Sequence, residues 1–289
     1  MSNKVWINGE LLDQEDAKIS VFDHGLLYGD GVFEGIRVYG GEIFRCQEHV
    51  DRLWDSARAI NLAVPIGKDE LVSAMRDAME ANAITDGYIR VVLTRGAGTL
   101  GLDANLCEDP QVIIIAATVK LYPQEYYEKG LEVITCGTVR NLANAVDPRI
   151  KSLNYLNNIL AKIEAQRAGV REAIMLNARG MVAECTGDNI FIVKDGEVVT
   201  PPVSAGILAG VTRQVVLDLA REDGMAVAER DMSRYDVYTA DECFLTGTAA
   251  ELIPVVRVDG REIGDGKPGP VTNRLLEMFR KEVAKNPNR

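Results

Sequence analysis

The stretch EAIMLNARGMVAECTGDNIFIVKDGEVVT, residues 172–200, decides the fold class. It holds four short apolar segments, and the turns between them are rich in Gly, Asn and Asp. Residues 172–177, 181–184, 189–194 and 197–200 are therefore predicted to be strands. Four strands in a row, with no helix between them, favour an α+β protein with mixed sheets over a doubly wound sheet, in which helices alternate with strands.

The segments that flank this run predict the rest of the C-terminal half. Before it, we expect a strand at residues 131–136, a polar connecting loop at 140–149, and a helix that stops near Gly169. One apolar face of that helix holds Leu153, Leu156, Ile159, Leu160 and Ile163. After the run, we expect a helix at 212–222, strands at 226–229, 242–245 and 253–258, and a helix through Leu275, Met278 and Phe279.

The N-terminal third begins with two predicted hairpins. Asn8-Gly9 separates the apolar segments 5–7 and 10–12, and Gly40-Gly41 separates 32–39 from 42–44. Tight two-residue turns need positive φ at both central positions, which Asn and Gly adopt readily. Helices are expected near residues 50–60 and 71–83, followed by strands at 88–94 and 111–120. The last of these is apolar enough to lie in the centre of a sheet.

A break in the pattern near residues 121–123 divides the chain. We predict a smaller N-terminal domain, residues 1–121, and a larger C-terminal domain, residues 122–289. Interdomain segments are expected near residues 122–130 and 140–149. A chain of 289 residues is long enough for two medium-sized domains and needs neither disulfides nor metal to fold.

Composition and charge exclude several classes of function. The 32 Lys and Arg residues against 43 Asp and Glu give a formal charge of −11, which argues against nucleic-acid binding. The longest apolar run, residues 112–117, is far shorter than the roughly 20 residues that span a bilayer. Two histidines and five widely spaced cysteines argue against a zinc site and a disulfide framework. We therefore expect a cytoplasmic protein with no metal, no membrane contact and no secretory leader.

Two segments have the composition of a phosphate site. Residues 206–212 run from a glycine-containing loop into a helix, whose first N–H groups and dipole attract anions. Residues 246–250 follow a short strand and supply small residues that let the backbone approach a ligand. Each segment alone is equally typical of an ordinary helix cap or turn.

Three further positions carry candidate chemistry. Lys151 lies between a polar loop and an apolar helix face, where partial desolvation favours the uncharged amine of a nucleophile. Glu184 ends an apolar strand, so an inward carboxylate there would need a cationic partner. Tyr88 and Arg90 share one face of a strand and together suit a carboxylate ligand. The alternatives are a solvated lysine, an exposed strand-end carboxylate and a solvent-facing strand side.

Seven ordered motifs together resemble the class IV, or fold type IV, pyridoxal-phosphate aminotransferases. The most similar branch is the branched-chain amino acid aminotransferases, and the resemblance covers almost the whole chain. The motifs are DHGLLYGDGVFEGIR at 23–37, HVDRL at 49–53, YIR at 88–90, KSLNY at 151–155, AECTGDNIF at 183–191, GVTR at 210–213 and GTAAE at 247–251.

The resemblance implies a fold and an activity. The expected fold has a smaller N-terminal α/β domain and a larger C-terminal domain with a mixed, barrel-like sheet, with the cofactor pyridoxal 5′-phosphate held between them. The implied activity is ping-pong transfer of an amino group between L-leucine, L-isoleucine or L-valine and 2-oxoglutarate. The partners are therefore small amino acids and 2-oxo acids, and a homodimer or higher homo-oligomer is expected.

The resemblance also implies roles for individual residues. Lys151 would form a Schiff base with the cofactor and later move a proton, and Glu184 would pair with the pyridine nitrogen. The other implied cofactor ligands are Tyr155 for the 3′ oxygen, and Arg52, Val211, Thr212 and Thr248 for the phosphate. The implied substrate-binding residues are Tyr28, Phe33, Gly35, Tyr88, Arg90, Thr248 and Ala249, with Tyr126 or Tyr127 closing one side.

Related activities on the same fold stay open. D-amino acid aminotransferases, (R)-amine transaminases and aminodeoxychorismate lyase share this fold, and Asp30-Gly31 after Tyr28-Gly29 is also found in the D-specific enzymes. Residues 33–37 combined with Tyr88 and Arg90 favour the branched-chain interpretation. The glycine-rich loop 96–102, which in this family often reaches a neighbouring subunit's site, and Asp103 differ from better-known bacterial versions. A cofactor-binding protein without turnover is disfavoured by the presence of Lys151, Glu184 and Arg52.

Overall fold

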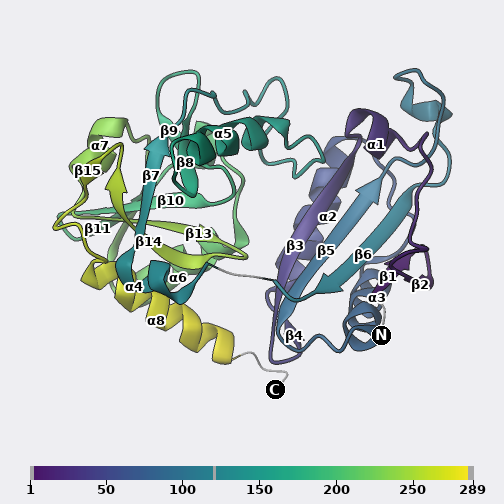
Figure 1. Cartoon of the computed structure of the whole chain (residues 1–289), viewed down its shortest axis with the longest axis horizontal. Helices are drawn as coiled ribbons and strands as arrows, with labels where there is room; N and C mark the ends of the chain where they lie inside the picture. The colour runs from purple at the N-terminus through teal and green to yellow at the C-terminus, as the bar shows by residue number, and fades with distance from the viewer. Residues whose placement is uncertain (1–2, 120–121, 286–289) are drawn as a thin grey trace. The chain divides into compact units, whose positions relative to one another are not determined.

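The computed structural model describes residues 3–119 and 122–285 (Figure 1). Contacts divide the chain into two compact units. Unit 1 comprises residues 3–119 together with Ile150–Asn154, and unit 2 comprises residues 122–149 and 155–285. The sequence placed a boundary at residue 121, which lies outside the described residues. The sequence also assigned residues 150–154 to the C-terminal domain, whereas the structure groups them with unit 1.

Unit 1 is built on an antiparallel sheet of six strands in the order β2-β1-β6-β5-β3-β4. The strands are β1 (Lys4–Ile7), β2 (Glu10–Asp13), β3 (Gly31–Tyr39), β4 (Glu42–Ile43), β5 (Gly87–Thr94) and β6 (Gln111–Ala117). Strand β6 lies between β1 and β5, so the central position predicted for the apolar segment is confirmed. It ends at Ala117, and residue 120, where the predicted strand ended, lies outside the described residues.

Both predicted hairpins of unit 1 are confirmed. Asn8 and Gly9 have φ of 48° and 100°, and Gly40 and Gly41 have φ of 55° and 85°. All four central residues therefore adopt the left-handed backbone that the tight turns require. Ile7 pairs with Glu10 across the first turn, which fixes the register of β1 and β2.

Two helices cover one face of the unit 1 sheet (Figure 1). Helices α2 (Cys46–Ala59) and α3 (Lys68–Ala81) bury apolar side chains against even-numbered positions of β3 and odd-numbered positions of β5. Because side chains alternate along a strand, residues 33, 35 and 37 of β3 and residues 88 and 90 of β5 lie on the other face. The short elements α1 (His24–Tyr28) and η1 (Ala104–Leu106) complete the unit and are too short to give a periodic signal.

Unit 2 is built on a mixed sheet of nine strands in the order β12-β11-β10-β13-β14-β7-β8-β9, with β15 paired to β14. The strands are β7 (Leu131–Thr135), β8 (Glu172–Leu176), β9 (Val182–Cys185), β10 (Asn189–Lys194), β11 (Glu197–Thr200), β12 (Ala226–Glu229), β13 (Glu242–Gly247), β14 (Glu251–Val258) and β15 (Arg261–Glu262). Pairs β7–β8, β7–β14 and β11–β12 are parallel and the others antiparallel. The predicted α+β class with a mixed, barrel-like sheet is confirmed, since β9 at one end of the order contacts β10.

The helices of unit 2 are α4 (Gln124–Lys129), α5 (Leu156–Arg167), α6 (Val211–Glu222), α7 (Arg234–Tyr238) and α8 (Pro270–Ala284), with the short η2 (Val203–Ala205). Helices α6 and α8 contact each other and β13, and the loop at 140–149 is irregular, as predicted. The sequence missed α4 and α7, which have fewer than two turns each. Within the described ranges, every helix is too short or too polar to cross a bilayer.

The predicted helix is present as α5, but Leu153 lies before its first residue and much of the predicted apolar face is exposed. Leu156, Ile159 and Leu160 are 64%, 51% and 47% exposed, while Ala161 and Ala165 are fully buried. The two alanines pack on β8, since small side chains let a helix approach a sheet closely. Apolar spacing indicates that a helix has an apolar face, but it does not say whether the same unit covers that face.

Candidate active site

The backbone of Lys151 is fixed to two elements of unit 1. Phe33 N on β3 donates a hydrogen bond to Lys151 O at 2.9 Å, and Leu153 N donates to Gly31 O at 2.9 Å. Lys151 N in turn donates to Ser56 Oγ on α2 at 3.2 Å. The lysine is therefore carried on a short bridge to the end of β3, although a long segment of unit 2 precedes that bridge in the chain.

The side chains of Lys151 and Arg90 both lie near the ring of Phe33. Lys151 Nζ is 4.7 Å from the ring centroid and the Arg90 guanidinium carbon is 4.4 Å from it. Arg90 Nη2 donates to Tyr88 Oη at 3.4 Å. The structure thus brings together four residues that the sequence named separately, and their cations give this face of the sheet a positive potential.

A side chain at Gly35 would collide with Tyr88 unless the tyrosine moved. A Cβ atom built there would lie 1.6 Å from Tyr88 Oη, so the tyrosine hydroxyl occupies the space of the missing side chain. Gly35 pairs directly with Arg90 across the sheet. The glycine therefore leaves the space that the Tyr88 hydroxyl occupies, and its role as a wall of the substrate site stays a prediction.

Arg52 is fixed by a buried carboxylate on the helix-covered face. Its Nε and Nη2 donate to Glu34 Oε1 and Oε2 at 2.7 and 2.9 Å, and His49 Nδ1 lies 2.8 Å from Glu34 Oε2. Burial by itself would raise the pKa of Glu34, but the charge of Arg52 and hydrogen bonds from His49 and Arg52 lower it to about 2. Burial also lowers the pKa of His49, so a neutral imidazole donates Nδ1–H to an ionised Glu34.

Tyr28 contacts the glycine-rich loop 96–102. It ends α1, is 37% exposed, and donates its hydroxyl hydrogen to Leu100 O at 2.7 Å. His24 Nε2 lies 2.8 Å from Thr99 O, so α1 is tied to the glycine-rich loop at two points. The structure therefore places Tyr28 with that loop, and its role as a wall of the substrate site stays a prediction.

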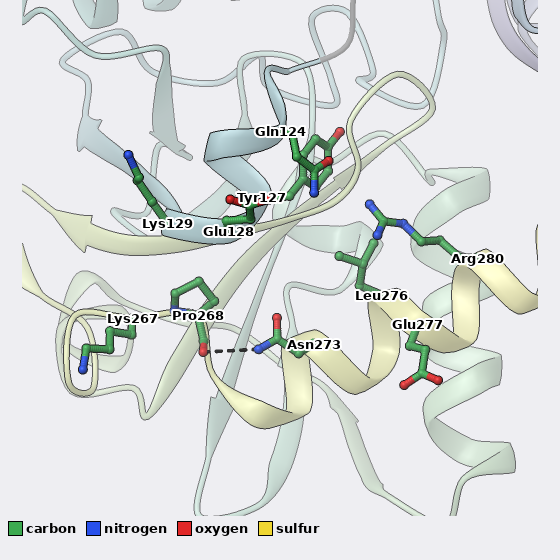
Figure 2. Close-up of a pocket in the computed structure, with 10 residues that line it drawn as sticks. All are labelled: Gln124, Tyr127, Glu128, Lys129, Lys267, Pro268, Asn273, Leu276, Glu277 and Arg280. Carbon is green, nitrogen blue, oxygen red and sulfur yellow. Dashed lines mark hydrogen bonds between the residues drawn. The ribbon is translucent and has the colours of Figure 1, made fainter.

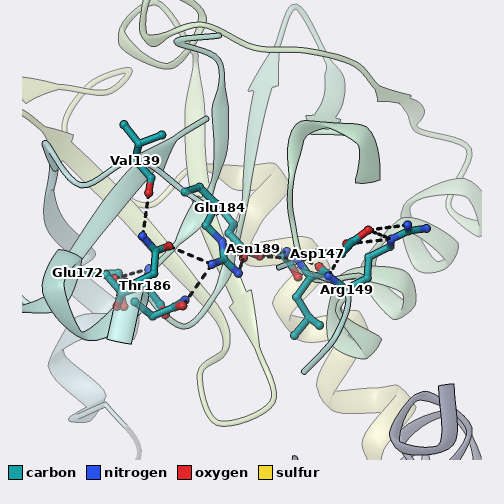
Figure 3. A network of polar contacts seen from close by, with 11 residues as sticks. Val139, Asp147, Arg149, Glu172, Glu184, Thr186 and Asn189 are labelled. Carbon is teal, nitrogen blue, oxygen red and sulfur yellow. Dashed lines mark hydrogen bonds and ion pairs between the residues drawn. The ribbon is translucent and has the colours of Figure 1, made fainter. Parts of the chain in front are cut away.

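Glu184 is the centre of a buried network in unit 2 (Figure 3). Arg140 Nε and Nη2 each donate to Glu184 Oε1 at 2.8 Å. Asn189 Nδ2 and Leu208 N donate to Oε2 at 3.1 and 2.9 Å. Glu184 is 4% exposed, so the inward position predicted for it is confirmed, and its cationic partner is Arg140.

Arg140 is a residue that the sequence analysis missed. It is 5% exposed, and its Nη1 donates to Asn157 Oδ1 and Asn158 Oδ1 at 3.2 and 3.3 Å. The loop before it is held by Glu164, which accepts hydrogen bonds from Gly137 N and Thr138 N. An arginine in a polar stretch gives no signal by itself, because only the fold brings it to Glu184.

Both predicted phosphate segments contain a glycine that the local packing requires. Gly210 is the N-cap of α6 and makes no side-chain cap, and a Cβ there would lie 2.1 Å from Asn189 Oδ1. A Cβ at Gly247 would lie 1.9 Å from Asp188 Oδ1. Beside Gly247, the hydroxyl of Thr246 is buried and has no hydrogen-bond partner within the described ranges. The uncapped first turn of α6 and this hydroxyl fit an oxygen-rich anionic group.

The remaining predicted residues of unit 2 are placed as follows. Thr248 and Ala249 lie half-buried in the turn between β13 and β14, and Tyr155 is the half-buried N-cap residue of α5. Tyr127 donates to Ala250 O at 3.0 Å and lines a cavity of about 760 Å³ between α4 and α8 (Figure 2). Tyr126 accepts a hydrogen bond from Arg171 Nε at 2.9 Å. That one of these tyrosines closes the substrate site stays a prediction.

Comparisons with known proteins agree over almost the whole chain. Residues 31–258 match the family model described as amino-transferase class IV. A putative branched-chain-amino-acid aminotransferase of Methanocaldococcus jannaschii is 49% identical over 277 residues, covering 96% of this chain and 95% of that protein. The crystal structure of the Escherichia coli branched-chain amino acid aminotransferase superposes with a TM-score of 0.94 at 39% identity, covering 97% of this chain and 94% of that one. The branched-chain aminotransferase of the archaeon Thermoproteus uzoniensis, crystallised with norvaline, superposes with a TM-score of 0.93 at 37% identity, covering 100% and 97%.

Proposed function

The chain belongs to the class IV aminotransferases, and from this premise we propose that it transfers amino groups between L-leucine, L-isoleucine or L-valine and 2-oxoglutarate. The observation that carries the proposal is the cluster of Lys151, Phe33, Tyr88 and Arg90 on one face of the unit 1 sheet. It combines an amine, an aromatic wall and a guanidinium. These are the groups needed to react with an amino acid, hold an aliphatic side chain and hold a carboxylate.

The proposed cofactor is pyridoxal 5′-phosphate, which the class IV family uses. When bound, it supplies an electron-withdrawing ring that stabilises negative charge at the substrate Cα. The chain offers matching groups: the amine of Lys151 for covalent attachment, and the buried carboxylate of Glu184 for the pyridine nitrogen. Tyr155 would donate to the 3′ oxygen. The proposed phosphate ligands are Arg52, Thr248 and the first residues of α6, Val211 and Thr212.

Lys151 would act a second time as a proton carrier. The amine at Nζ would accept the proton from the substrate Cα and deliver it to C4′ of the cofactor, on the far side of the substrate nitrogen, which needs a base held by a fixed backbone. The bridges to β3 and α2 supply that rigidity. Two hydrogen bonds from Arg140 hold the Glu184 carboxylate in one orientation, which would fix its position relative to the pyridine nitrogen.

One substrate site must accept both an isobutyl group and a carboxylate. Phe33 and Gly35 would line the space for the aliphatic chain, and Arg90, stacked on Phe33, would take the distal carboxylate of glutamate or 2-oxoglutarate. Tyr88 and the backbone amides of Thr248 and Ala249 would hold the α-carboxylate. When no carboxylate is bound, the guanidinium lies on an aromatic ring. Burying its charge there costs less free energy than burying it with no partner.

We further propose a cytoplasmic homodimer or higher homo-oligomer. Exposed apolar side chains of unit 1 support it, since α1, the residues before it and the segment 100–106 expose Val21, Phe22, Leu26, Leu100, Leu102 and Leu106 at 51% or more. Exposed apolar side chains in such number are typical of a surface that contacts another molecule. Sedimentation of the active protein as a monomer would contradict the proposal.

The decisive experiment follows the visible absorption band of the protein loaded with pyridoxal phosphate. L-leucine is expected to bleach the band, and 2-oxoglutarate to restore it. D-alanine and (R)-phenylethylamine are added in parallel, because they report the related activities on this fold. Bleaching by D-alanine without bleaching by L-leucine would overturn the proposed substrate class, and a colourless protein that borohydride does not label at Lys151 would overturn the cofactor.

A further inference from the structure

The side-chain amide of Asn189 contacts three parts of unit 2. Asn189 is the first residue of β10 and is 5% exposed. Its Nδ2 donates to Glu184 Oε2 at 3.1 Å (Figure 3) and to Leu208 O at 3.0 Å, so both amide hydrogens are used. The amide oxygen lies against Gly210, where a Cβ atom would stand 2.1 Å from it.

These contacts join two parts of the proposed cofactor site. Glu184 is the proposed partner of the pyridine nitrogen, and Gly210 is the N-cap residue of α6, whose first residues are proposed phosphate ligands. Leu208 N also donates to Glu184 Oε2 at 2.9 Å, so Asn189, Leu208 and the carboxylate form a closed ring of three hydrogen bonds. A closed ring resists changes in spacing, because no member can move without breaking a bond to another.

Two other asparagines of unit 2 each support one side of this arrangement. Asn158, which is 7% exposed, accepts a hydrogen bond from Arg140 Nη1 at 3.3 Å and so supports the cation beside the carboxylate. Asn177 Nδ2 donates to Ala205 O at 3.0 Å, directly before the loop 206–210. Within the described ranges, neither side chain hydrogen-bonds to both the carboxylate and the loop, whereas Asn189 bonds to both.

We propose that Asn189 is a positioning residue that fixes the spacing between the Glu184 carboxylate and the first turn of α6, so that one cofactor molecule reaches both. The inference rests on the proposed function, which assigns Glu184 and α6 to the cofactor and gives Asn189 no role. A ligand held at two points gains affinity only if the spacing of the two sites lets both contacts form together. Asn189 would therefore act on the pair of contacts and not on either one alone.

The test compares a two-point ligand with its separate parts. Pyridoxal has the ring and the aldehyde of pyridoxal 5′-phosphate but no phosphate, and inorganic phosphate supplies the other part. Titration of the full chain gives a dissociation constant for each of the three. Asn189→Ala should weaken binding of pyridoxal 5′-phosphate by about tenfold or more, because the spacing is no longer fixed. Binding of pyridoxal and of phosphate should change by less than about threefold, because each still meets its own ligands.

Asn158→Ala and Asn177→Ala are the matched controls, since each loosens one side only. In both, the ratio of the affinities for pyridoxal 5′-phosphate and pyridoxal should stay within about threefold of wild type. The same fall of this ratio in both controls as in Asn189→Ala would show a general loosening and overturn the proposal. Asn189→Ser, which keeps one donor, should give an intermediate ratio, and it replaces the Ala variant if that variant does not fold.

Three results for Asn189→Ala would also overturn the proposal. An equal loss for pyridoxal 5′-phosphate and pyridoxal would confine Asn189 to the Glu184 side. An equal loss for pyridoxal 5′-phosphate and inorganic phosphate would confine it to α6. Unchanged binding of all three ligands would leave it without a role in cofactor binding.

Failure of the proposed function gives a different result from failure of this inference. If the wild-type chain bound pyridoxal 5′-phosphate but L-leucine did not bleach the absorption band, the substrate class would be lost, and the affinity ratios would still report on Asn189. If the reaction proceeded normally while Asn189→Ala kept the wild-type ratio, only the role of Asn189 would be lost. A wild-type chain that bound no pyridoxal 5′-phosphate would overturn both.

Discussion

The face of β3 and β5 in unit 1 and the Glu184 network in unit 2 handle charge in opposite ways. On the unit 1 face, Lys151, Arg90 and Arg37 lie near aromatic rings, and β3, β5 and β6 supply no carboxylate to this face. In unit 2, both oxygens of Glu184 accept hydrogen bonds from the chain itself, two of them from Arg140. The first region gathers cations on a face to which β3, β5 and β6 bring no carboxylate, and the second pairs its carboxylate with an arginine of the same unit.

This difference predicts whether a substitution in each region lowers activity or stability. Removing a cation from the unit 1 face should cost activity or binding and leave stability nearly intact. Removing a member of the Glu184 network should cost stability first, because it leaves a buried charge unpaired.

The largest expected effect is on the unit 1 face. Lys151→Ala should lower the rate of L-leucine transamination by about 10³-fold or more, because both the amine for attachment and the proton carrier are lost. Its denaturant midpoint should stay close to wild type. Rates are measured by single-turnover absorbance, with Lys194→Ala, an exposed lysine paired with Asp241, as the control that keeps activity. If Lys151→Ala kept a tenth of the wild-type rate, the proposed role of the unit 1 face in catalysis would be contradicted.

The next effect tests the Glu184 network. Arg140→Met should lower the free energy of unfolding by about 3–5 kcal/mol, because Glu184 stays buried without its cation. Chemical denaturation of the cofactor-loaded protein measures it. Replacing both partners, as in Arg140→Met with Glu184→Leu, should recover much of the loss, since no charge is then left unpaired. A double variant no more stable than the single one would show that the ion pair is not the cause.

A smaller effect is expected from a single methyl group at Gly35. Gly35→Ala must displace the hydroxyl of Tyr88, since the new Cβ would lie 1.6 Å from it. We expect kcat/KM for L-leucine to fall by about 10-fold to 100-fold, because Tyr88, the proposed carboxylate ligand, would be misplaced. Gly67→Ala is the matched control, since a Cβ there meets nothing within 4 Å. Similar kinetics for the two alanine variants would contradict the close packing of Tyr88.

The smallest effect is a dependence of stability on pH from the Glu34 cluster. Both Glu34 and His49 have pKa values lowered by folding, so their contributions are lost as the pH falls. Below pH 6.5 the unfolded chain takes up a proton at His49, and between pH 4.5 and about 2 it takes one up at Glu34. Each group adds a slope of at most about 1.4 kcal/mol per pH unit.

The Glu34 contribution can be isolated by substitution. Glu34→Gln should flatten the stability curve between pH 4.5 and 2 and leave exposed carboxylates unaffected. Unfolding by denaturant at a series of pH values measures this slope. An unchanged slope in the variant would mean that Arg52 is not held by an ionised Glu34.

The parts of the fold that could be predicted are those determined by neighbouring residues. Asn8-Gly9 and Gly40-Gly41 define their turns locally, and residues 189–194 and 197–200 form strands at the predicted bounds. The α5 face was wrong because its leucines have the spacing of a packed face but nothing in unit 2 covers them.

The candidate site was predictable only through its motifs. Lys151 and Glu184 stand in recognisable stretches, whereas Arg140 matters because of what surrounds it. Arg140 is important because β9 brings Glu184 to it. Whether a buried arginine has an ion-pair partner depends on tertiary contacts, which a single sequence does not show.

The placement of Ile150–Asn154 in unit 1 has a consequence for the order in which the protein is made. A ribosome completes residues 3–119 first, yet the end of β3 waits for its bridge until the segment up to Arg149 has also been synthesised. Lys151, the proposed nucleophile, therefore joins unit 1 only after unit 2 has begun to emerge. Such a delayed long-range contact slows completion of the fold.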